Sequence, residues 1–523
     1  MNEREQLTAP LPVSWRVFLV LVVLCGAVLR FVNLEKKPYW LDETYTSLRV
    51  SGYDETDDAP PRLYTGRVIT SADVQIFQRA NSDTPAIGTV RGLARREPHL
   101  PPVYFLAARA AAHWLGDTVA ATRGVSVICG VLSLLALFWL CLEWSGDQVA
   151  AWLAMGLAAV SPLLIRFAQE ARPYSMWMAA ILLANVAFLR MTREPGRSNS
   201  ALYALSLAFA LYVQLLTILT VLAHGVYFLL SGMWRQDRVR RHYLAASAAA
   251  TLCLAPWIGV LLIKRKTAVA MTSWQTDPAP LERLLEGWAK GITALMPGWP
   301  VSHPAAFLVA VAVVLLVGYA LHALYRDTPR SAWLYPLLLI VIPVAPFVLL
   351  DLSLGGQRST ATRYMLPAFL IVEVAVAHLL ARGIRRRLWQ ALALAILVTG
   401  IIASVAVVRT ETWWGLSKVE VDLARILNQS PRPLVISDAH FGMIAPLSHL
   451  VHPDVGFLLN QRPTNLDIRQ GYDPVYVCRP SNGLREAVEQ RPGWKLHPVY
   501  QEARKNGVVF SLFWVVREGN GDE

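Results

Sequence analysis

The stretch Trp15 to Leu34, WRVFLVLVVLCGAVLRFVNL, is long and apolar enough to cross a bilayer, and Tyr39-Trp40-Leu41-Asp42-Glu43-Thr44-Tyr45-Thr46 follows it almost at once. Two adjacent carboxylates so close to the end of a membrane helix are costly unless water, a partner or a substrate uses them. We therefore take Asp42 and Glu43 as the candidate chemical centre. The first span is too long for a signal-peptide core and has no small-residue cleavage site, so it predicts an uncleaved signal anchor.

The rest of the chain shares this apolar character. Of its 523 residues, 54% are hydrophobic and only 16% are charged, with a mean hydropathy of +0.39, which is the composition of a polytopic membrane protein. Much of the formal charge of +12 lies in short loops between apolar blocks, so it indicates membrane topology and not nucleic-acid binding. The five cysteines predict neither a disulfide framework nor a zinc site, because they stand singly and mostly inside apolar blocks.

The apolar blocks predict about eleven transmembrane helices. The block Ala201 to Leu230 carries a polar Gln214 near its middle, so it predicts two short helices with a turn between them. The other predicted spans are Trp15–Leu34, Val119–Leu142, Val149–Phe167, Tyr174–Leu189, Tyr243–Ile263, Ala305–Leu324, Trp333–Leu350, Tyr364–Leu380 and Leu388–Val408.

The orientation of these spans follows from the basic residues in short loops, which favour the cytoplasm. The segment Leu100 to Leu115 would cover only about 24 Å as a helix, less than the roughly 30 Å of a bilayer core. If it crossed, a cytoplasmic N-terminus at residues 1–14 would also place every basic cluster outside, so we predict a re-entrant or interfacial segment. The clusters are Arg190, Arg193 and Arg197; Arg235, Arg238, Arg240 and Arg241; Arg326 and Arg330; and Arg382, Arg385, Arg386 and Arg387.

This topology predicts that the polar candidate segments gather on the extracytoplasmic side. They are the first loop at 35–118, the turn at 166–175, the loops at 264–303 and 351–363, and the tail from residue 409. The tail, residues 409–523, predicts a small α/β domain following the membrane domain of residues 15–408. Its predicted strands are Pro433–Ser437, Pro474–Cys478 and Val508–Val516, and its predicted helix is Asn482–Gln490.

Asp42 and Glu43 are the first candidate pair for chemistry. Neighbours in sequence point about 100° apart on a helix, so only one of the two is expected to enter a shared site. The alternative is structural: Asp42 would cap a short helix that begins at Glu43, because aspartate is a preferred N-cap residue.

A second candidate group is Gln169-Glu170-Ala171-Arg172-Pro173-Tyr174, at the outer end of a predicted span. Arg172 could bind a phosphate oxygen with two hydrogen bonds, and Glu170 could hold a cation or orient Arg172. Pro173 suits the start of the next helix. The structural alternative is an interfacial ion pair between arginine and glutamate.

Further candidates are His99-Leu100-Pro101-Pro102-Val103-Tyr104 and the outer basic residues. Paired prolines hold the chain extended before the short segment, but a lone histidine such as His99 is more often structural. Outer cations favour either anion binding or contact with lipid headgroups, since the positive-inside rule does not explain them. These cations and their neighbour are Lys264, Arg358, Arg363 and Tyr364. The tail residues His440, His449, His452 and Asp438 match no standard metal-site spacing.

Taken together, these motifs resemble the GT-C glycosyltransferases, membrane enzymes of the protein O-mannosyltransferase and lipid A aminoarabinose transferase type, with the bacterial Rgt-like members most similar. The resemblance rests on a carboxylate pair after the first span, a His-x-Pro-Pro-x-Tyr segment, the Gln-Glu-Ala-Arg-Pro-Tyr turn and an Arg-Tyr-x-x-Pro entry to a late span. It covers roughly residues 15 to 400.

The resemblance implies transfer of a sugar from a polyprenyl-phosphate donor to a lipid, glycan or protein acceptor, on the extracytoplasmic face of a bacterial plasma (inner) membrane. By this analogy Asp42 is the general base, Glu43 is the second acid of the pair, and Arg172, Arg358, Arg363 and Lys264 hold the phosphate. His99, Glu170, Tyr174 and Tyr364 complete the expected substrate-binding set; the inserted Leu100 shifts His99 from the family's usual His-Pro-Pro register.

The chemistry agrees with this analogy. Arginines that neutralise a departing phosphate lower the barrier, and a carboxylate opposite the anomeric carbon assists the nucleophile, so a single displacement inverts the anomeric centre. No Gly-rich phosphate loop occurs, which favours a lipid-linked donor over a nucleotide sugar. The sequence does not decide whether the reaction requires a divalent cation, and no other cofactor is expected.

Two other functions fit parts of the pattern. A transporter or flippase of polyprenyl-linked or other anionic substrates would use the same cations, although transporters place binding residues near the bilayer midplane. A non-catalytic scaffold that displays the tail would not need Asp42.

Overall fold

The computed structural model describes residues 12–53, 62–81, 83–296, 306–461, 471–503 and 509–517. Most of the predicted cytoplasmic N-terminus at residues 1–14 lies outside the described residues. By its internal packing the chain divides into two units. The membrane unit comprises Met1–Leu34, Leu93–Ala107 and Arg123–Thr410, and the sheet unit comprises Glu35–Gly92, Ala108–Thr122 and Glu411–Glu523.

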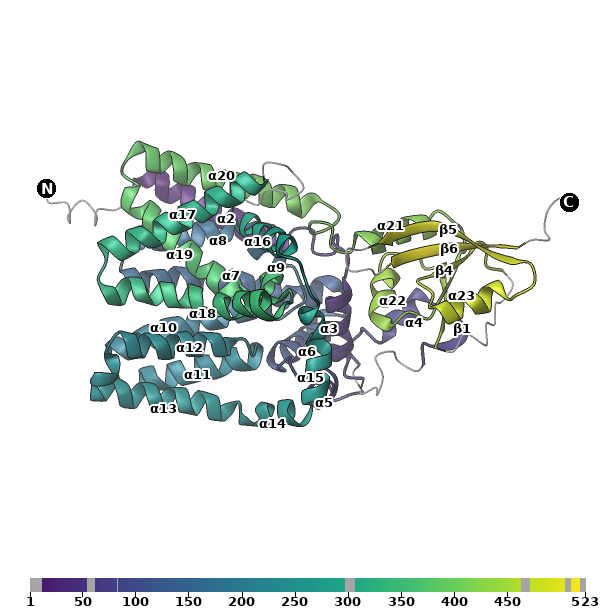
Figure 1. The fold of residues 1–523 in the computed structure, drawn as a ribbon, viewed down its shortest axis with the longest axis horizontal. Helices are drawn as coiled ribbons and strands as arrows, with labels where there is room; N and C mark the ends of the chain where they lie inside the picture. Colours follow the sequence, from purple (N-terminus) through teal and green to yellow (C-terminus); the bar gives the residue numbers. More distant parts are fainter. Residues whose placement is uncertain are drawn as a thin grey trace. The chain divides into compact units, whose positions relative to one another are not determined.

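The membrane unit is built from long apolar helices, several of which run side by side (Figure 1). Among the described residues, seven helices are long and apolar enough to cross a membrane, and nine if each of two bent pairs forms one span. The chain is therefore a multi-pass membrane protein, as the composition predicts, while the count of eleven spans stays a prediction. The seven are α2 Val13–Phe31, α7 Val119–Ser145, α10 Tyr174–Arg193, α17 Ala306–Asp327, α18 Arg330–Leu354, α19 Leu366–Gly383 and α20 Arg387–Arg409.

The two bent pairs break where a proline, Pro162 or Pro256, lies in the first turn of the second helix. Helices α8 (Gln148–Ala159) and α9 (Pro162–Ala168) meet at 66°, and α13 (Asp237–Cys253) and α14 (Ala255–Ile263) meet at 47°. Proline cannot donate the helical hydrogen bond and its ring clashes with the preceding turn, so the helix direction changes there.

The block around Gln214 divides as predicted, into α11 (Arg197–Val213) and α12 (Thr217–Leu230). Helix α6 (Val103–Leu115) has 13 residues, too few for a bilayer crossing at about 1.5 Å per residue. The remaining short helices of this unit are η1 Met233–Arg235, α15 Arg265–Thr272, η2 Ser273–Thr276, α16 Leu281–Leu295, η3 Arg358–Thr360 and η4 Thr362–Tyr364.

The sheet unit contains one six-stranded mixed sheet with the order β1-β3-β2-β4-β6-β5. Strand β2 runs parallel to β3 and β4, and the other neighbouring pairs are antiparallel. The strands are β1 Thr65–Thr70, β2 Leu434–Ser437, β3 Gly456–Asn460, β4 Val475–Cys478, β5 Trp494–Ala503 and β6 Val509–Arg517. The predicted α/β character of the tail is confirmed, but the sequence analysis did not foresee that a first-loop strand, β1, joins the sheet.

Helices cover both faces of this sheet. On one face the apolar side chains of β2, β3, β4 and β6 meet those of α3 (Leu41–Ser51), α4 (Ser71–Ile76), α21 (Lys418–Leu427) and α22 (Phe441–Ser448). On the other they meet α23 (Asn482–Glu489), because alternate residues of a strand point to opposite faces. The helix α5 (Ala86–Arg96) completes the described elements. The first loop therefore folds together with the tail.

Candidate active site

Asp42 and Glu43 lie in the first turn of α3. This helix begins at Leu41 with Trp40 as its N-cap, so the alternative that Asp42 caps a helix beginning at Glu43 is wrong. Glu43 is fully buried, and its Oε2 accepts a hydrogen bond from the Trp40 amide at 3.4 Å. Asp42 is only partly buried. The structure thus separates the pair: Glu43 helps to close the helix terminus, and Asp42 is the more exposed of the two carboxylates.

The sheet unit holds α3 through close packing against α22. Leu48 of α3 belongs to the core on that face of the sheet, and the Tyr45 ring packs edge-on against Phe441 with centroids 6.5 Å apart. A Cβ at Gly442 would lie 2.5 Å from the Tyr45 ring, so only glycine permits this approach. The helix that carries Asp42 is therefore fixed by residues of the tail.

In the membrane unit, the second candidate group forms the turn between α9 and α10. Glu170 and Arg172 are both buried, and Pro173 directly precedes α10, as predicted. Glu170 Oε1 accepts a hydrogen bond from Arg166 Nε at 2.7 Å. Arg166 is therefore a partner of Glu170, whereas Arg172 was the expected residue; a separation of four residues along a helix is the usual spacing for such a pair. The Arg172 guanidinium lies 5.9 Å from the centre of the Tyr174 ring.

Buried hydrogen bonds anchor this turn to the end of α2. Gln169 Nε2 donates to the carbonyls of Leu29 and Val32, both at 2.8 Å, where α2 ends. In return, the buried Arg30 of α2 donates to the carbonyls of Ala158 and Ala159 at 2.9 and 2.8 Å, where α8 ends. Carbonyls at helix ends have no partner within the helix, so each helix end is satisfied by a side chain from the other segment.

The His-x-Pro-Pro-x-Tyr segment meets the same turn through its tyrosine. Tyr104 and Ser126 share a hydrogen bond of 2.9 Å, and Ser126 Oγ donates to the Arg172 carbonyl at 3.1 Å. His99 is half-buried, one residue after Pro98, whose carbonyl accepts from Trp257 Nε1 at 3.0 Å. The structure therefore joins the second and third candidate groups, with Ser126 of α7 connecting Tyr104 to Arg172.

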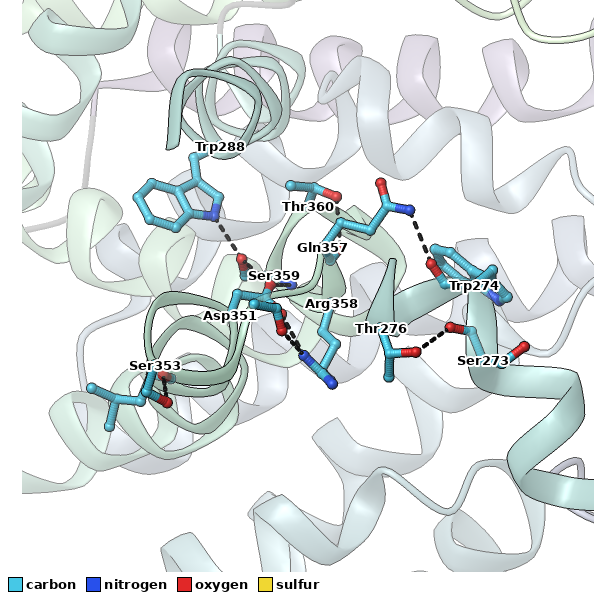
Figure 2. Close-up of polar contacts among 12 residues, drawn as sticks. Ser273, Trp274, Thr276, Trp288, Asp351, Ser353, Gln357, Arg358, Ser359 and Thr360 are labelled. Atoms are coloured by element: carbon cyan, nitrogen blue, oxygen red, sulfur yellow. Dashed lines mark hydrogen bonds and ion pairs between the residues drawn. The ribbon is translucent and has the colours of Figure 1, made fainter. Parts of the chain in front are cut away.

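The fourth candidate group is built around a buried aspartate, Asp351, at the end of α18 (Figure 2). Its Oδ1 accepts from Arg358 Nη1 at 2.9 Å, and its Oδ2 accepts from both the amide and the hydroxyl of Ser359 at 2.7 Å. Trp288 Nε1 of α16 donates to Ser359 Oγ at 3.0 Å. The Arg358 side chain remains 17% exposed, so one edge is fixed by Asp351 while another can meet a ligand.

Arg363 and Tyr364 adjoin this cluster. The Arg363 guanidinium lies 5.1 Å from the centre of the Trp274 ring, and Gln275 Nε2 donates to the Tyr364 hydroxyl at 2.8 Å. The backbone amide of Gln357 also donates to the Gln275 carbonyl, at 2.9 Å. Residues 273–276 thus contact the loop that carries both Arg358 and Arg363. These contacts were not predicted from the sequence.

Helix α16 connects the two arginine-bearing turns of the membrane unit, because it packs against both α9 and η3. A Cβ at Gly287 would lie 2.6 Å from Thr360 Cγ2, and one at Gly291 would lie 3.0 Å from Thr362 Cγ2. At the C-terminal end of α16, the Leu295 carbonyl accepts a hydrogen bond from Ser161 Oγ at 3.1 Å. Lys264 is an exposed residue between α14 and α15.

Within the described ranges, no three histidine, cysteine, aspartate or glutamate side chains are grouped as metal ligands. The carboxylates of these two turns, Glu170 and Asp351, instead accept hydrogen bonds from arginine and serine side chains. These turns present cationic groups, which suit an anionic ligand such as a phosphate.

The fold defines a class: a helical multi-pass membrane protein whose first loop and tail together form a mixed-sheet unit. It is similar to the crystal structure of ArnT from Cupriavidus metallidurans bound to undecaprenyl phosphate, with a TM-score of 0.56 and 14% identity over 96% of this chain and 98% of that one. Against the same protein in its apo state the TM-score is 0.52, with the same identity and coverage. At this identity the likeness establishes the fold.

A family model described as dolichyl-phosphate-mannose-protein mannosyltransferase matches residues 99–260. No curated protein sequence matches the chain. The matched range begins at His99 and includes the turn with Glu170 and Arg172. The resemblance to GT-C glycosyltransferases that the sequence motifs indicate is thereby confirmed.

Proposed function

We propose that this protein is a glycosyltransferase that moves a sugar from a polyprenyl-phosphate donor to a lipid, glycan or protein acceptor on the extracytoplasmic face of a bacterial plasma membrane. The observation that carries the proposal is Arg358, which Asp351 fixes on one edge and which stays partly exposed in a chain of ArnT-like fold. A preorganised cation of this kind stabilises charge that develops on a leaving group.

In the proposed reaction the bond between the anomeric carbon and the phosphate oxygen breaks as the acceptor oxygen forms the new glycosidic bond. Asp42 accepts the proton of the acceptor hydroxyl, and the electron pair of the broken bond stays on the phosphate. Arg358, Arg172 and Arg363 offset the added negative charge, with Lys264 as a further contributor. One displacement inverts the anomeric configuration.

Support for the separate roles comes from each local environment. Asp42 is the partly exposed acid of its pair, at a helix N-terminus, where a carboxylate is favoured by the helix dipole. Arg172 and Arg358 are guanidinium groups, which bind phosphate oxygens in a forked geometry that lysine cannot reproduce. Tyr174 and Tyr364 each lie within 6 Å of an arginine, so they limit the positions that the guanidinium groups can take. Glu43, Glu170 and His99 are proposed to support the site.

The test is to reconstitute the full-length protein in nanodiscs and offer polyprenyl-phosphate sugars that differ in the sugar, together with an extract of cell-envelope acceptors. The measured product is free polyprenyl phosphate. We expect wild type and Asp454→Asn, which changes an exposed aspartate, to release it at equal rates from at least one donor. Flux of an intact donor across the membrane without release of polyprenyl phosphate would overturn the proposal.

A further inference from the structure

The sheet unit contains a pocket of about 190 Å³ that none of the roles above uses. It is lined by the start of α3, by the end of α4 and the residues after it, by the start of α7, and by His449 after α22. Pockets for drug-sized ligands begin at roughly 300 Å³, so this one has room for a single ring and not for a chain of rings.

The pocket lining includes a buried amide, Gln78, which is 7% exposed. Its Oε1 is bonded to His449 Nε2 at 2.9 Å, and its Nε2 meets no hydrogen-bonding partner in the part of the chain that the structure describes. A buried donor left without an acceptor is destabilising, so such groups in native proteins are normally paired. A ligand oxygen in the pocket would satisfy it.

The mouth of the pocket carries both charges. Arg79 Nε and Asp117 Oδ2 lie 3.5 Å apart, and their side chains are 51% and 46% exposed. An anionic ligand would gain from Arg79 and lose to Asp117, and a cationic ligand would meet the reverse. A neutral ligand with many hydroxyls gains from both, because each hydroxyl donates and accepts a hydrogen bond.

The walls add ring surfaces and further hydrogen-bonding groups. The Tyr39 and His449 rings lie against each other with centroids 5.2 Å apart, and both line the pocket. Gln75 also lines it, held by a bond of 2.8 Å from its Nε2 to the Ser448 carbonyl. Aromatic surface beside amides and a charged pair suits a sugar ring, which has apolar C–H faces and a polar edge.

We propose that this pocket binds one neutral hexose unit of a glycan, and that the unit belongs to the acceptor. The second part rests on the proposed function; the first part does not. The second part of the proposal narrows the acceptor class to glycans. The pocket would hold one sugar unit of the acceptor while another unit is glycosylated.

The test measures binding first, with no reaction involved. Full-length protein in nanodiscs is titrated with the methyl glycosides of glucose, galactose and mannose, and with glucuronate and glucose 6-phosphate, using saturation-transfer NMR. We expect at least one neutral glycoside to bind and the charged sugars to bind more weakly. No neutral glycoside binding, or tighter binding of the charged sugars, would overturn the proposal.

Three variants locate the binding. We expect Gln78→Leu, which replaces the amide by an apolar side chain, to weaken binding about tenfold, and Arg79→Ala to weaken it several-fold. Arg67→Ala, which removes another exposed arginine of the sheet unit, serves as the matched control and should leave binding unchanged. Because Arg79 is half exposed, its variant should fold even if Gln78→Leu does not. Binding that Arg79→Ala leaves intact would contradict the assignment.

The same variants separate this inference from the proposed function. If sugar transfer occurs and Arg79→Ala raises the KM for a glycan acceptor with kcat retained, both proposals hold. If transfer occurs with an unchanged acceptor KM, the acceptor role of the pocket fails alone. If neutral sugars bind but no donor is ever consumed, the pocket stands and the glycosyltransferase proposal fails.

Discussion

The pair formed by Asp351 and Arg358 gives the most quantitative prediction. In Asp351→Asn the amide oxygen can keep the two hydrogen bonds from Ser359, but its NH2 then faces Arg358 in place of a carboxylate oxygen. One charge-assisted bond is lost, which is worth about 1.5–3 kcal/mol. The figure stays below the 3–5 kcal/mol of a fully buried pair because Arg358 is 17% exposed.

This loss should appear in the rate with the donor. At about 1.4 kcal/mol per factor of ten, kcat/KM for the polyprenyl-phosphate sugar should fall about 10- to 100-fold in Asp351→Asn, because Arg358 no longer meets the phosphate in a fixed position. The assay is release of polyprenyl phosphate by protein in nanodiscs. Asp327→Asn is the matched control: it breaks a 2.8 Å pair with Arg382 in which both side chains are about one-third exposed, worth only about 0–1 kcal/mol.

A double-variant cycle distinguishes positioning of Arg358 from general destabilisation. If Asp351 acts through Arg358, Asp351→Asn should cost little more in an Arg358→Lys background than Arg358→Lys costs alone. The reasoning would be refuted if Asp351→Asn stayed within twofold of wild type, or if its effect were undiminished in the Arg358→Lys background.

Three predictions concern stability. Gly287→Ala should lower the thermal midpoint, because its Cβ would lie 2.6 Å from Thr360 and overpacking costs about 1–3 kcal/mol. Gly318→Ala is the control, since a Cβ there would have no heavy atom within 4 Å, and it should leave the midpoint unchanged. Equal midpoints in the two variants would contradict the packing of α16. Tyr335→Phe should destabilise the membrane unit by only about 0.6–1.7 kcal/mol, since it removes one 2.6 Å bond to Asn185, and a larger loss in denaturant titrations would count against this. Burial raises the pKa of the Tyr64 phenol, which donates to the Ala439 carbonyl, so the stability that it contributes is present below about pH 10, the unfolded value, and is lost above it. Wild type should therefore lose stability relative to Tyr64→Phe between about pH 9 and 11, and parallel pH profiles would refute this.

Local patterns in the sequence predicted much of the fold. Apolar blocks of membrane length predicted the long helices, and the polar Gln214 marked the break between α11 and α12. The amphipathic helix α16 was missed, although Leu281, Leu284, Trp288 and Leu295 follow a helical spacing.

Pairings between distant segments could not be predicted from one sequence. Strand β1 pairs with β3 nearly 400 residues later, and no local signal specifies such a partner. The pairing of Arg358 with Asp351 could have been predicted from the sequence. Asp351 is an acid at the end of an apolar helix, which is the pattern that identified Asp42 as a candidate. The role of Gln169 at the end of α2 carried no such signal, because it depends on the position of a helix some 140 residues away.

The central claim is that Asp42 takes the proton of the acceptor hydroxyl as the bond between sugar and phosphate breaks. The most direct measurement compares donor binding and release of polyprenyl phosphate in the same preparations of wild type, Asp42→Asn and Glu43→Gln. We predict that Asp42→Asn binds the donor as tightly as wild type and releases almost no polyprenyl phosphate, while Glu43→Gln retains turnover in proportion to its folded fraction. Full turnover in Asp42→Asn would contradict the account.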